Sequence, residues 1–350
     1  MNSGEIVVSV VVPAYNAETW LPLTLESACQ QTLREIEILV VDDDSSDRTA
    51  EVVREFSARD PRVRLIHRKN GGVGAARNTA IAEARGRYIA PLDADDLWAP
   101  EKLAAQVACM EAGGEQMGMC YCWSEKIDAR GQRITAGFPF EIEGSVLRPL
   151  VLRNFVGSGS VPMFRAAALA KVGPYLERSE QGGEQGCEDW DLSLRIAGHY
   201  QIGLVRRCLV GYRQIANCMS LNAEGMSRSY QVIIARAKAR DTGLPPAVFR
   251  WSAGNFYSYL VSKCYLWGDY PGCLQSMARA ASADIMLFGN RRFYLMGLKS
   301  LLRILTGTRG MPPGADPDAP QKRQRSSWAE SIQSRRWQDA VETTGALPKS

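Results

Sequence analysis

Short apolar stretches that each end at polar residues constrain the fold of this chain most. The first is a valine-rich run at 7–12, and runs of this kind are typical of strands buried on both faces of a parallel sheet. Four such runs occur within the first hundred residues: 7–12, 36–41, 63–67 and 88–92. Stretches with helical spacing separate them: 19–31, 48–59 and 75–84. This alternation predicts an α/β fold, an open and mostly parallel sheet flanked by helices.

Three polar segments follow directly on these predicted strands, at 13–16, 42–44 and 93–96. In open α/β sheets, ligands bind outside the carboxyl ends of the strands, so the three segments are expected to share one edge. The last of them carries three carboxylates in four positions, which repel one another by about 1 kcal/mol per pair in water. A divalent cation with oxygen ligands would relieve this repulsion. The alternative is a solvated loop that caps a helix beginning near Pro100.

Composition places the chain among soluble globular proteins. Its 350 residues are 45% hydrophobic and 23% charged, and the nine cysteines lack Cys-x-x-Cys spacing. An odd number of scattered cysteines fits reduced thiols in a cytosolic protein. The first apolar run lacks a basic segment before it, and no stretch reaches roughly 18 unbroken apolar residues, so we expect neither a signal peptide nor a spanning helix.

Charge is unevenly distributed along the chain. From Ala223 onward there are 18 Lys/Arg and 9 Asp/Glu, a net of +9, whereas the preceding residues carry 24 and 29, a net of −5. We expect a catalytic domain at 1–222, a helical extension at 223–309 and a largely disordered tail at 310–350, since the tail lacks core-forming runs. Within the extension, 285–305 has four basic residues and no acid among many apolar ones. Such a stretch can lie on an anionic membrane surface or pack on the protein, and both readings stay open.

Four motifs in register make the first half specific. They are Val-Pro-Ala-Tyr-Asn at 12–16, Val-Asp-Asp-Asp-Ser-Ser-Asp at 41–47, Asn-Gly-Gly-Val-Gly-Ala-Ala-Arg-Asn at 70–78 and Asp-Ala-Asp-Asp at 93–96. In this order and spacing they resemble the family 2 glycosyltransferases of GT-A fold, which use nucleotide-diphosphate sugars. One departure is Asp44, where the family usually has glycine, so this turn is expected to differ locally.

The resemblance implies a donor site built from these motifs. Pro13, Ala14, Tyr15 and Asp43 would surround the nucleoside, with the tyrosine ring stacking on the base and the aspartate accepting a base N–H. Arg77 would contact the diphosphate or the acidic loop.

The acidic loop matches the family's Asp-x-Asp. Asp95 is the expected direct ligand of Mg²⁺ or Mn²⁺, Asp93 would support the sugar or the metal, and Asp96 would cap the following helix. The cation would neutralise the diphosphate leaving group.

A second acidic cluster opens a predicted helix at Cys187–Arg195. Its carboxylates suit the positive end of the helix dipole, which by itself explains them. The resemblance instead implies that Asp189 is the general base, because sugar transfer with inversion requires removal of the acceptor hydroxyl proton. Ser160, Glu188 and Trp190 are the implied acceptor-side candidates.

These features predict an inverting, metal-dependent glycosyltransferase of surface polysaccharide or glycoconjugate assembly. The acceptor would be a sugar or a lipid-linked glycan, with no nucleic-acid partner. The location would be the cytoplasm, extending to the inner face of the plasma membrane if 285–305 binds lipid. A nicotinamide dehydrogenase is disfavoured because no glycine follows the first strand within 13–17. The alternatives are a non-catalytic nucleotide-sugar-binding module and, with less support, a nucleotidyltransferase, whose triphosphate loop is missing at 13–16.

Overall fold

A computed structural model describes residues 5–135, 139–215, 219–241, 243–284 and 291–307. The contacts divide the chain into two compact units. One is formed by residues 1–145 and 155–214, and the other by residues 146–154 and 215–350. The tail predicted to be disordered at 310–350 lies outside the described residues, as do 285–290.

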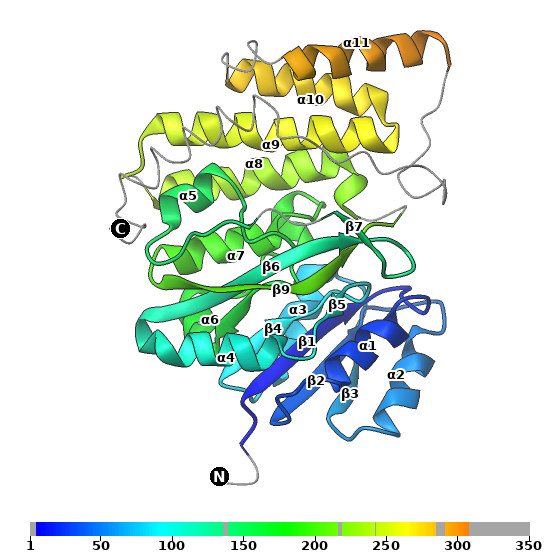
Figure 1. The fold of residues 1–350 in the computed structure, drawn as a ribbon, viewed down its shortest axis with the longest axis vertical. Helices are drawn as coiled ribbons and strands as arrows, with labels where there is room; N and C mark the ends of the chain where they lie inside the picture. The colour runs from blue at the N-terminus through cyan, green and yellow to red at the C-terminus, as the bar shows by residue number, and fades with distance from the viewer. Residues whose placement is uncertain (1–4, 136–138, 216–218, 242, 285–290, 308–350) are drawn as a thin grey trace. The chain divides into compact units, whose positions relative to one another are not determined.

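The first unit is built on one mixed sheet (Figure 1). Its strands follow the order β3-β2-β1-β4-β8-β6-β9-β5, with β7 beside β6. Their bounds are β1 Val8–Ala14, β2 Ile36–Asp42, β3 Val63–His67, β4 Tyr88–Pro91, β5 Leu97–Trp98, β6 Met117–Ile127, β7 Arg133–Thr135, β8 Met163–Arg165 and β9 Gln201–Arg213. The first four pair in parallel, as do β6 and β9, while β8 joins the two parts through antiparallel pairing with β4 and β6. The predicted sheet is therefore confirmed.

The buried strands explain why their ends carry the polar residues. Every residue of β1 and of β2 is buried, so side chains that need solvent or ligand can stand only beyond the carboxyl ends. One carboxylate inside β2, Glu37, is buried as well, and it accepts hydrogen bonds from Ser9 Oγ at 2.7 Å and from Arg85 Nη2 at 2.7 Å. The pairing satisfies a charge that would otherwise be costly to bury.

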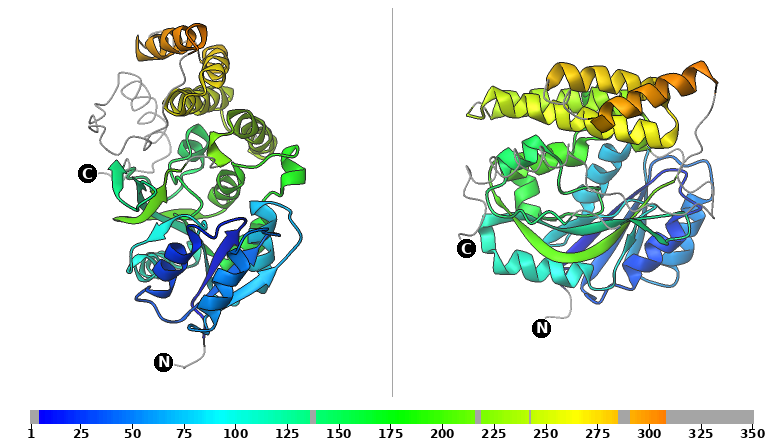
Figure 2. Two further views of the ribbon diagram at one scale, coloured as in Figure 1. Left: turned by 90° about the vertical axis from the view of Figure 1, so that its right-hand side faces the viewer. Right: turned by 45° about the horizontal axis from the view of Figure 1, so that its top comes forward.

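Helices cover both faces of this sheet (Figure 1). Right-handed crossovers place α1 and α2 on one face of β1–β3 and α3 on the other. The helices of this unit are α1 Leu21–Cys29, α2 Thr49–Ser57, α3 Val73–Glu83, α4 Lys102–Ala112, α6 Ala166–Val172 and α7 Glu188–Ala197, with 3₁₀ turns η1 Gly114–Gln116 and η2 Arg178–Gln181. Figure 2 shows the long strands β6 and β9 running together, as their pairing requires.

The second unit is helical. It contains α5 Leu147–Leu152, the turn η3 Met219–Leu221, α8 Ala223–Arg240, α9 Pro246–Trp267, α10 Tyr270–Ala283 and α11 Arg291–Leu305. Tyr230 of α8 stacks on Phe256 of α9 with ring centroids 4.0 Å apart. Gly268 ends α9 in the left-handed conformation, and Asp269 caps α10 by accepting from Gly272 N at 2.9 Å. Among the described residues, no helix is long and apolar enough to cross a membrane.

Asp44 stands in the turn after β2, where a local difference from a glycine turn is expected. This residue has φ +71°, the left-handed conformation that a glycine adopts without steric cost. The chain around it is pinned by neighbours, because Asn16 N donates to Ser45 Oγ at 3.0 Å and Ser46 N donates to Asn16 Oδ1 at 2.9 Å. The turn thus keeps a glycine-type backbone although an aspartate occupies it.

Asp47 lies two positions before the first residue of α2. The N-cap of α2 is Arg48, which makes no side-chain cap bond. Asp47 still stabilises the helix start from one position earlier, since its Oδ1 accepts from Thr49 N at 3.0 Å.

We predict that Asp44→Gly stabilises the protein and Asp44→Ala destabilises it. A non-glycine residue in the left-handed region costs about 1 kcal/mol, and Asp tolerates it better than Ala. Thermal unfolding should show about 0.5–1 kcal/mol of gain for glycine and a loss of similar size for alanine. Asp44 is exposed, so neither substitution changes the packing of the core. Equal midpoints for the two variants would show that this turn is not strained.

Candidate active site

The acidic loop between β4 and β5 is folded into the protein rather than solvated. Asp96 is fully buried and accepts hydrogen bonds from Ser160 Oγ at 2.6 Å and from Arg213 N at 2.9 Å. Burial, and then the charges of Asp95 and Asp93, raise the pKa of Asp96 well above its usual value. The prediction that Asp96 caps the next helix is wrong, because α4 starts at Lys102 after Glu101 and has no side-chain cap.

Asp93 and Asp95 are the two carboxylates of this loop that stay partly accessible. Asp93 N donates to Ser160 Oγ at 2.9 Å, which anchors the loop. Burial and the charge of Asp93 raise the pKa of Asp95 to about 6. In the described part of the chain, no side chain of another residue donates a hydrogen bond to the Asp95 carboxylate.

This pair fits a divalent cation. A cation would remove the repulsion that raises the pKa of Asp95, and Mg²⁺ commonly uses one or two carboxylates together with substrate phosphates. The described residues contain no group of three or more His, Cys, Asp or Glu side chains arranged to hold a metal. Further ligands would therefore come from a diphosphate and from water.

Arg213, at the end of β9, holds the acidic loop from behind and was not among the predicted site residues. Its side chain is buried, with Nε donating to Asp95 O at 2.6 Å. Its Nη1 donates to the carbonyls of Asp128 and Ala129, both at 2.9 Å, in the turn between β6 and β7. The guanidinium also lies over the ring of Trp20, 4.7 Å from its centroid. An arginine that closes an apolar strand is the sequence signal that could have identified it, because a buried cation needs partners.

Arg77 joins the acidic loop to the second acidic cluster. It lies on α3, is buried, and donates through Nη2 to Asp93 Oδ1 at 2.5 Å and through Nη1 to Glu188 Oε1 at 2.8 Å. Although burial opposes it, the charges of Asp93 and Glu188 raise the pKa of Arg77 further above its usual value. Of the two expected contacts of Arg77, the structure contains the one to the acidic loop.

Asp189 is the carboxylate of the second cluster that remains available. Both oxygens of Glu188 are engaged, one by Arg77 and the other by Gly186 N at 2.8 Å. Within the described ranges, the Asp189 carboxylate accepts one hydrogen bond, from Trp190 N at 2.7 Å. Burial, and then the charge of Glu188, raise the pKa of Asp189 to about 7. A helix dipole alone would lower this pKa, so burial and the charge of Glu188 outweigh the dipole here.

The acceptor-side candidates are mostly committed to the protein itself. Ser160 is fully buried, and its hydroxyl donates to Asp96 and accepts from Asp93 N. Trp190 is only 4% exposed. The neighbouring strand β8 begins at Met163, and Ser160 lies in the turn before it. Ser160 therefore positions the acidic loop and does not face an acceptor in this structure.

The nucleoside side of the site is partly open. Tyr15 is 56% exposed beyond the end of β1, whereas Pro13 and Ala14 are buried within that strand. The tyrosine ring is thus the accessible flat surface of the first motif, as stacking on a base requires.

The carboxylate of Asp43 already accepts hydrogen bonds from the glycine-rich loop at 70–74. This residue is buried and accepts from Arg68 Nη1, from Gly71 N at 3.1 Å and from Gly72 N at 2.7 Å. Gly72 has φ +89°, a backbone conformation that favours glycine, and a Cβ there would also meet Gln185 Oε1 at 2.4 Å. A base N–H would be a further donor to a carboxylate that already accepts from three groups.

Comparison with known proteins gives consistent matches. Residues 9–172 match the family described as glycosyl transferase family 2. The chain is 36% identical over 137 residues to a chondroitin synthase of Escherichia coli, covering 39% of this chain and 20% of that protein. It is 44% identical over 107 residues to the E. coli UDP-Glc:alpha-D-GlcNAc-diphosphoundecaprenol beta-1,3-glucosyltransferase WfgD, covering 30% of this chain and 42% of that protein. The matched region spans less than half the length of either relative.

Two solved structures share the fold. Residues 1–349 of Staphylococcus aureus TarS, in complex with UDP-GlcNAc, align with a TM-score of 0.51 at 16% identity, covering 91% of this chain and 100% of that one. The mannosyltransferase PcManGT from Pyrobaculum calidifontis, in complex with GDP-Man and Mn²⁺, aligns with a TM-score of 0.55 at 20% identity, covering 87% and 88%. The expected GT-A architecture is confirmed.

We predict that Asp189→Asn stabilises the protein more at pH 8 than at pH 5. Asp189 binds its proton more tightly when folded, with a pKa of about 7, than when unfolded, so ionisation destabilises the fold as pH rises from about 4 to 7 and the full penalty remains above pH 7. Asparagine removes this penalty, on the order of 1–3 kcal/mol at pH 8.

Thermal unfolding at the two pH values measures the effect. Glu188→Gln is the matched control and should instead lower the midpoint at pH 8, because it weakens a buried pair with Arg77. A midpoint for Asp189→Asn below that of the wild type at pH 8 would contradict the raised pKa.

Proposed function

Because this chain belongs, through residues 9–172, to the family 2 glycosyltransferases, we propose that it transfers a sugar from a nucleotide-diphosphate donor to an acceptor hydroxyl with inversion. One observation carries the proposal: Arg77 ties Asp93 of the acidic loop to Glu188, the neighbour of Asp189. A group suited to a diphosphate and a group suited to a proton are thereby held in one site.

Asp189 would act as the general base. It would accept the acceptor hydroxyl proton while that oxygen attacks the anomeric carbon and the bond to the diphosphate breaks. A base works best when its pKa lies near the working pH, and the pKa of Asp189 is about 7. A single base suffices for inversion, and Glu188 is engaged by Arg77 and Gly186, which leaves Asp189 for the role.

Asp95 and Asp93 would hold Mg²⁺ or Mn²⁺, and the bound cation would neutralise the leaving diphosphate. This chain's own residues prepare that position. Arg213 fixes the backbone of the loop through Asp95 O, and Ser160 fixes it through Asp93 N. Asp95 therefore meets its ligand with little reorganisation, which is how preorganised sites reduce the cost of binding.

The donor's base would stack on Tyr15 beside Pro13 and Ala14, with Asp43 as the acceptor of a base N–H. The exposed ring of Tyr15 supports this placement. The acceptor would be a sugar or a lipid-linked glycan in surface polysaccharide or glycoconjugate assembly, in keeping with the names of the E. coli relatives. The enzyme would work in the cytoplasm, at the inner face of the plasma membrane.

We predict that Asp189→Ala and Asp95→Ala each abolish transfer by the purified protein while thermal unfolding shows an intact fold. Loss of a general base lowers the rate by about 10²–10⁴-fold. Transfer is measured with and without Mn²⁺, and Glu26→Ala, an exposed carboxylate on α1, is the control that should stay active.

Two outcomes would count against these assignments. Full activity of Asp189→Ala would remove it as the base. A wild-type rate that is the same with a chelator as with Mn²⁺ would remove the cation from Asp95. Donor hydrolysis by the wild type, absent from both variants, would separate an enzyme from a non-catalytic binding module.

We predict that kcat/KM falls about tenfold per pH unit below pH 7 and levels off above it. The cause is protonation of Asp189, whose pKa is about 7, since the neutral acid cannot accept a proton. The profile is measured between pH 5 and 9 at saturating Mn²⁺, and the stability of the protein is checked at each pH. A flat profile between pH 5 and 8 is incompatible with Asp189 as the base.

A further inference from the structure

The strongest feature outside the donor site is an exposed apolar stripe on α11. Seven of the twelve large apolar side chains that are exposed in the described residues belong to this one helix of 15 residues. Six of them recur at the spacing that places them on one face, and we call them the leucine stripe: Tyr294, Leu295, Leu298, Leu301, Leu302 and Leu305. Each is between 46% and 74% exposed. Single exposed apolar residues are ordinary, but a contiguous stripe indicates an interaction surface.

The opposite side of α11 packs against α10. Phe293 and Ser300 are buried, and a Cβ on Gly297 would meet Met277 Cε of α10 at 2.6 Å, so the two helices are in close contact there. Arg303 donates to the hydroxyl of Tyr270 at the start of α10. The leucine stripe is thus the part of α11 that this contact leaves exposed.

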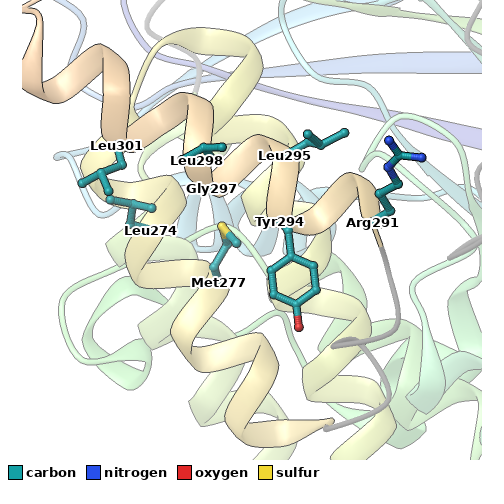
Figure 3. A pocket seen from close by; sticks show the side chains of 8 residues that line it. All are labelled: Leu274, Met277, Arg291, Tyr294, Leu295, Gly297, Leu298 and Leu301. Atoms are coloured by element: carbon teal, nitrogen blue, oxygen red, sulfur yellow. The ribbon is translucent and has the colours of Figure 1, made fainter.

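The apolar surface continues onto α10. Leu274 and Met277 of α10, with residues of the stripe, line a shallow groove of about 500 Å³ between the two helices (Figure 3). Arg291 is the charged residue in that lining. The surface therefore combines an apolar strip with a cation at one end.

Charge shows what kind of partner this surface fits. The charged residues of α11 are all basic, Arg291, Arg292, Lys299 and Arg303, and Arg291 and Lys299 are exposed. Basic residues beside a leucine face are complementary to anionic lipid headgroups, into which such a helix can lie with its apolar face buried.

Two other occupants fit less well. A second copy that paired α11 with α11 would bring eight cations together without an acid, four from each chain. Residues 308–350 of the same chain carry 7 Lys/Arg and 5 Asp/Glu, so their net charge of +2 has the same sign as that of α11.

We propose that α11 lies in the plane of an anionic membrane surface, with the leucine stripe inserted among the headgroups and Lys299 and Arg291 facing the phosphates. A helix of 15 residues is about 22 Å long, too short to span the bilayer core of about 30 Å. This inference specifies how the protein would reach the membrane location given under the proposed function, and it rests on that function only for the location. Binding to the membrane itself requires no sugar donor.

The experiment is co-sedimentation of the full chain with vesicles of phosphatidylcholine alone or with roughly one third phosphatidylglycerol. We expect the wild type to bind the anionic vesicles. The double variant Leu298→Glu/Leu302→Glu should bind them at least tenfold more weakly, and Lys299→Glu at least about fivefold more weakly. Leu266→Glu is the matched control, because Leu266 on α9 is a leucine of 45% exposure outside the stripe, and it should bind as the wild type does.

Donor hydrolysis in the absence of vesicles separates this inference from the proposed function, since all three variants should retain it. Failure of the wild type to bind anionic vesicles, or equal binding by the double variant, would overturn the inference while leaving the transferase intact. A soluble wild-type dimer that the double variant converts to monomer, without vesicle binding by either, would also overturn it and assign the stripe to a second copy.

Discussion

The site depends on the two ion pairs of Arg77. This guanidinium is buried and bonds Asp93 on one side and Glu188 on the other, so neither carboxylate nor the cation is left uncompensated. Removing one partner of such a buried pair destabilises a protein by about 3–5 kcal/mol, because the remaining charge is stranded. The acidic loop after β4 and the start of α7 therefore cannot drift apart without losing this compensation. In the function proposed above, the same interaction would hold the leaving group and the base in one site.

Because Arg77 pairs with Glu188, the neighbouring carboxylate of Asp189 stays available. Both carboxylate oxygens of Glu188 accept hydrogen bonds, one from Arg77 and one from Gly186 N. Burial and the charge of Glu188 raise the pKa of the neighbouring Asp189. Asp95 is in a similar position in the other cluster, with its pKa raised to about 6. Both residues destabilise the fold when ionised, and such local cost is common where a site is poised for chemistry.

Local patterns predicted well what depends on neighbours in sequence. The first four strands and the helices between them follow from β-branched runs and helical spacing. The turn at Asp44, which was expected to differ locally, keeps the left-handed backbone that a glycine adopts. Asp96 and Ser160 were misassigned, because their mutual bond joins positions far apart in the chain. Arg213 was overlooked for the same reason, since its partners come from two separate turns.

The sequence by itself determined the α/β class, the sheet edge where the polar loops gather, the acidic loop with its donor-site resemblance, and the basic, leucine-rich character of α11. These depend on periodicity and on short motifs, which are local. Only the tertiary structure showed why Asp189 is the available carboxylate of its cluster, since Arg77 and Gly186 bond both oxygens of Glu188. It also decided which face of α11 is exposed, because that depends on the contact with α10. Both outcomes depend on burial and on pairing between residues far apart in the chain, which the sequence alone does not show.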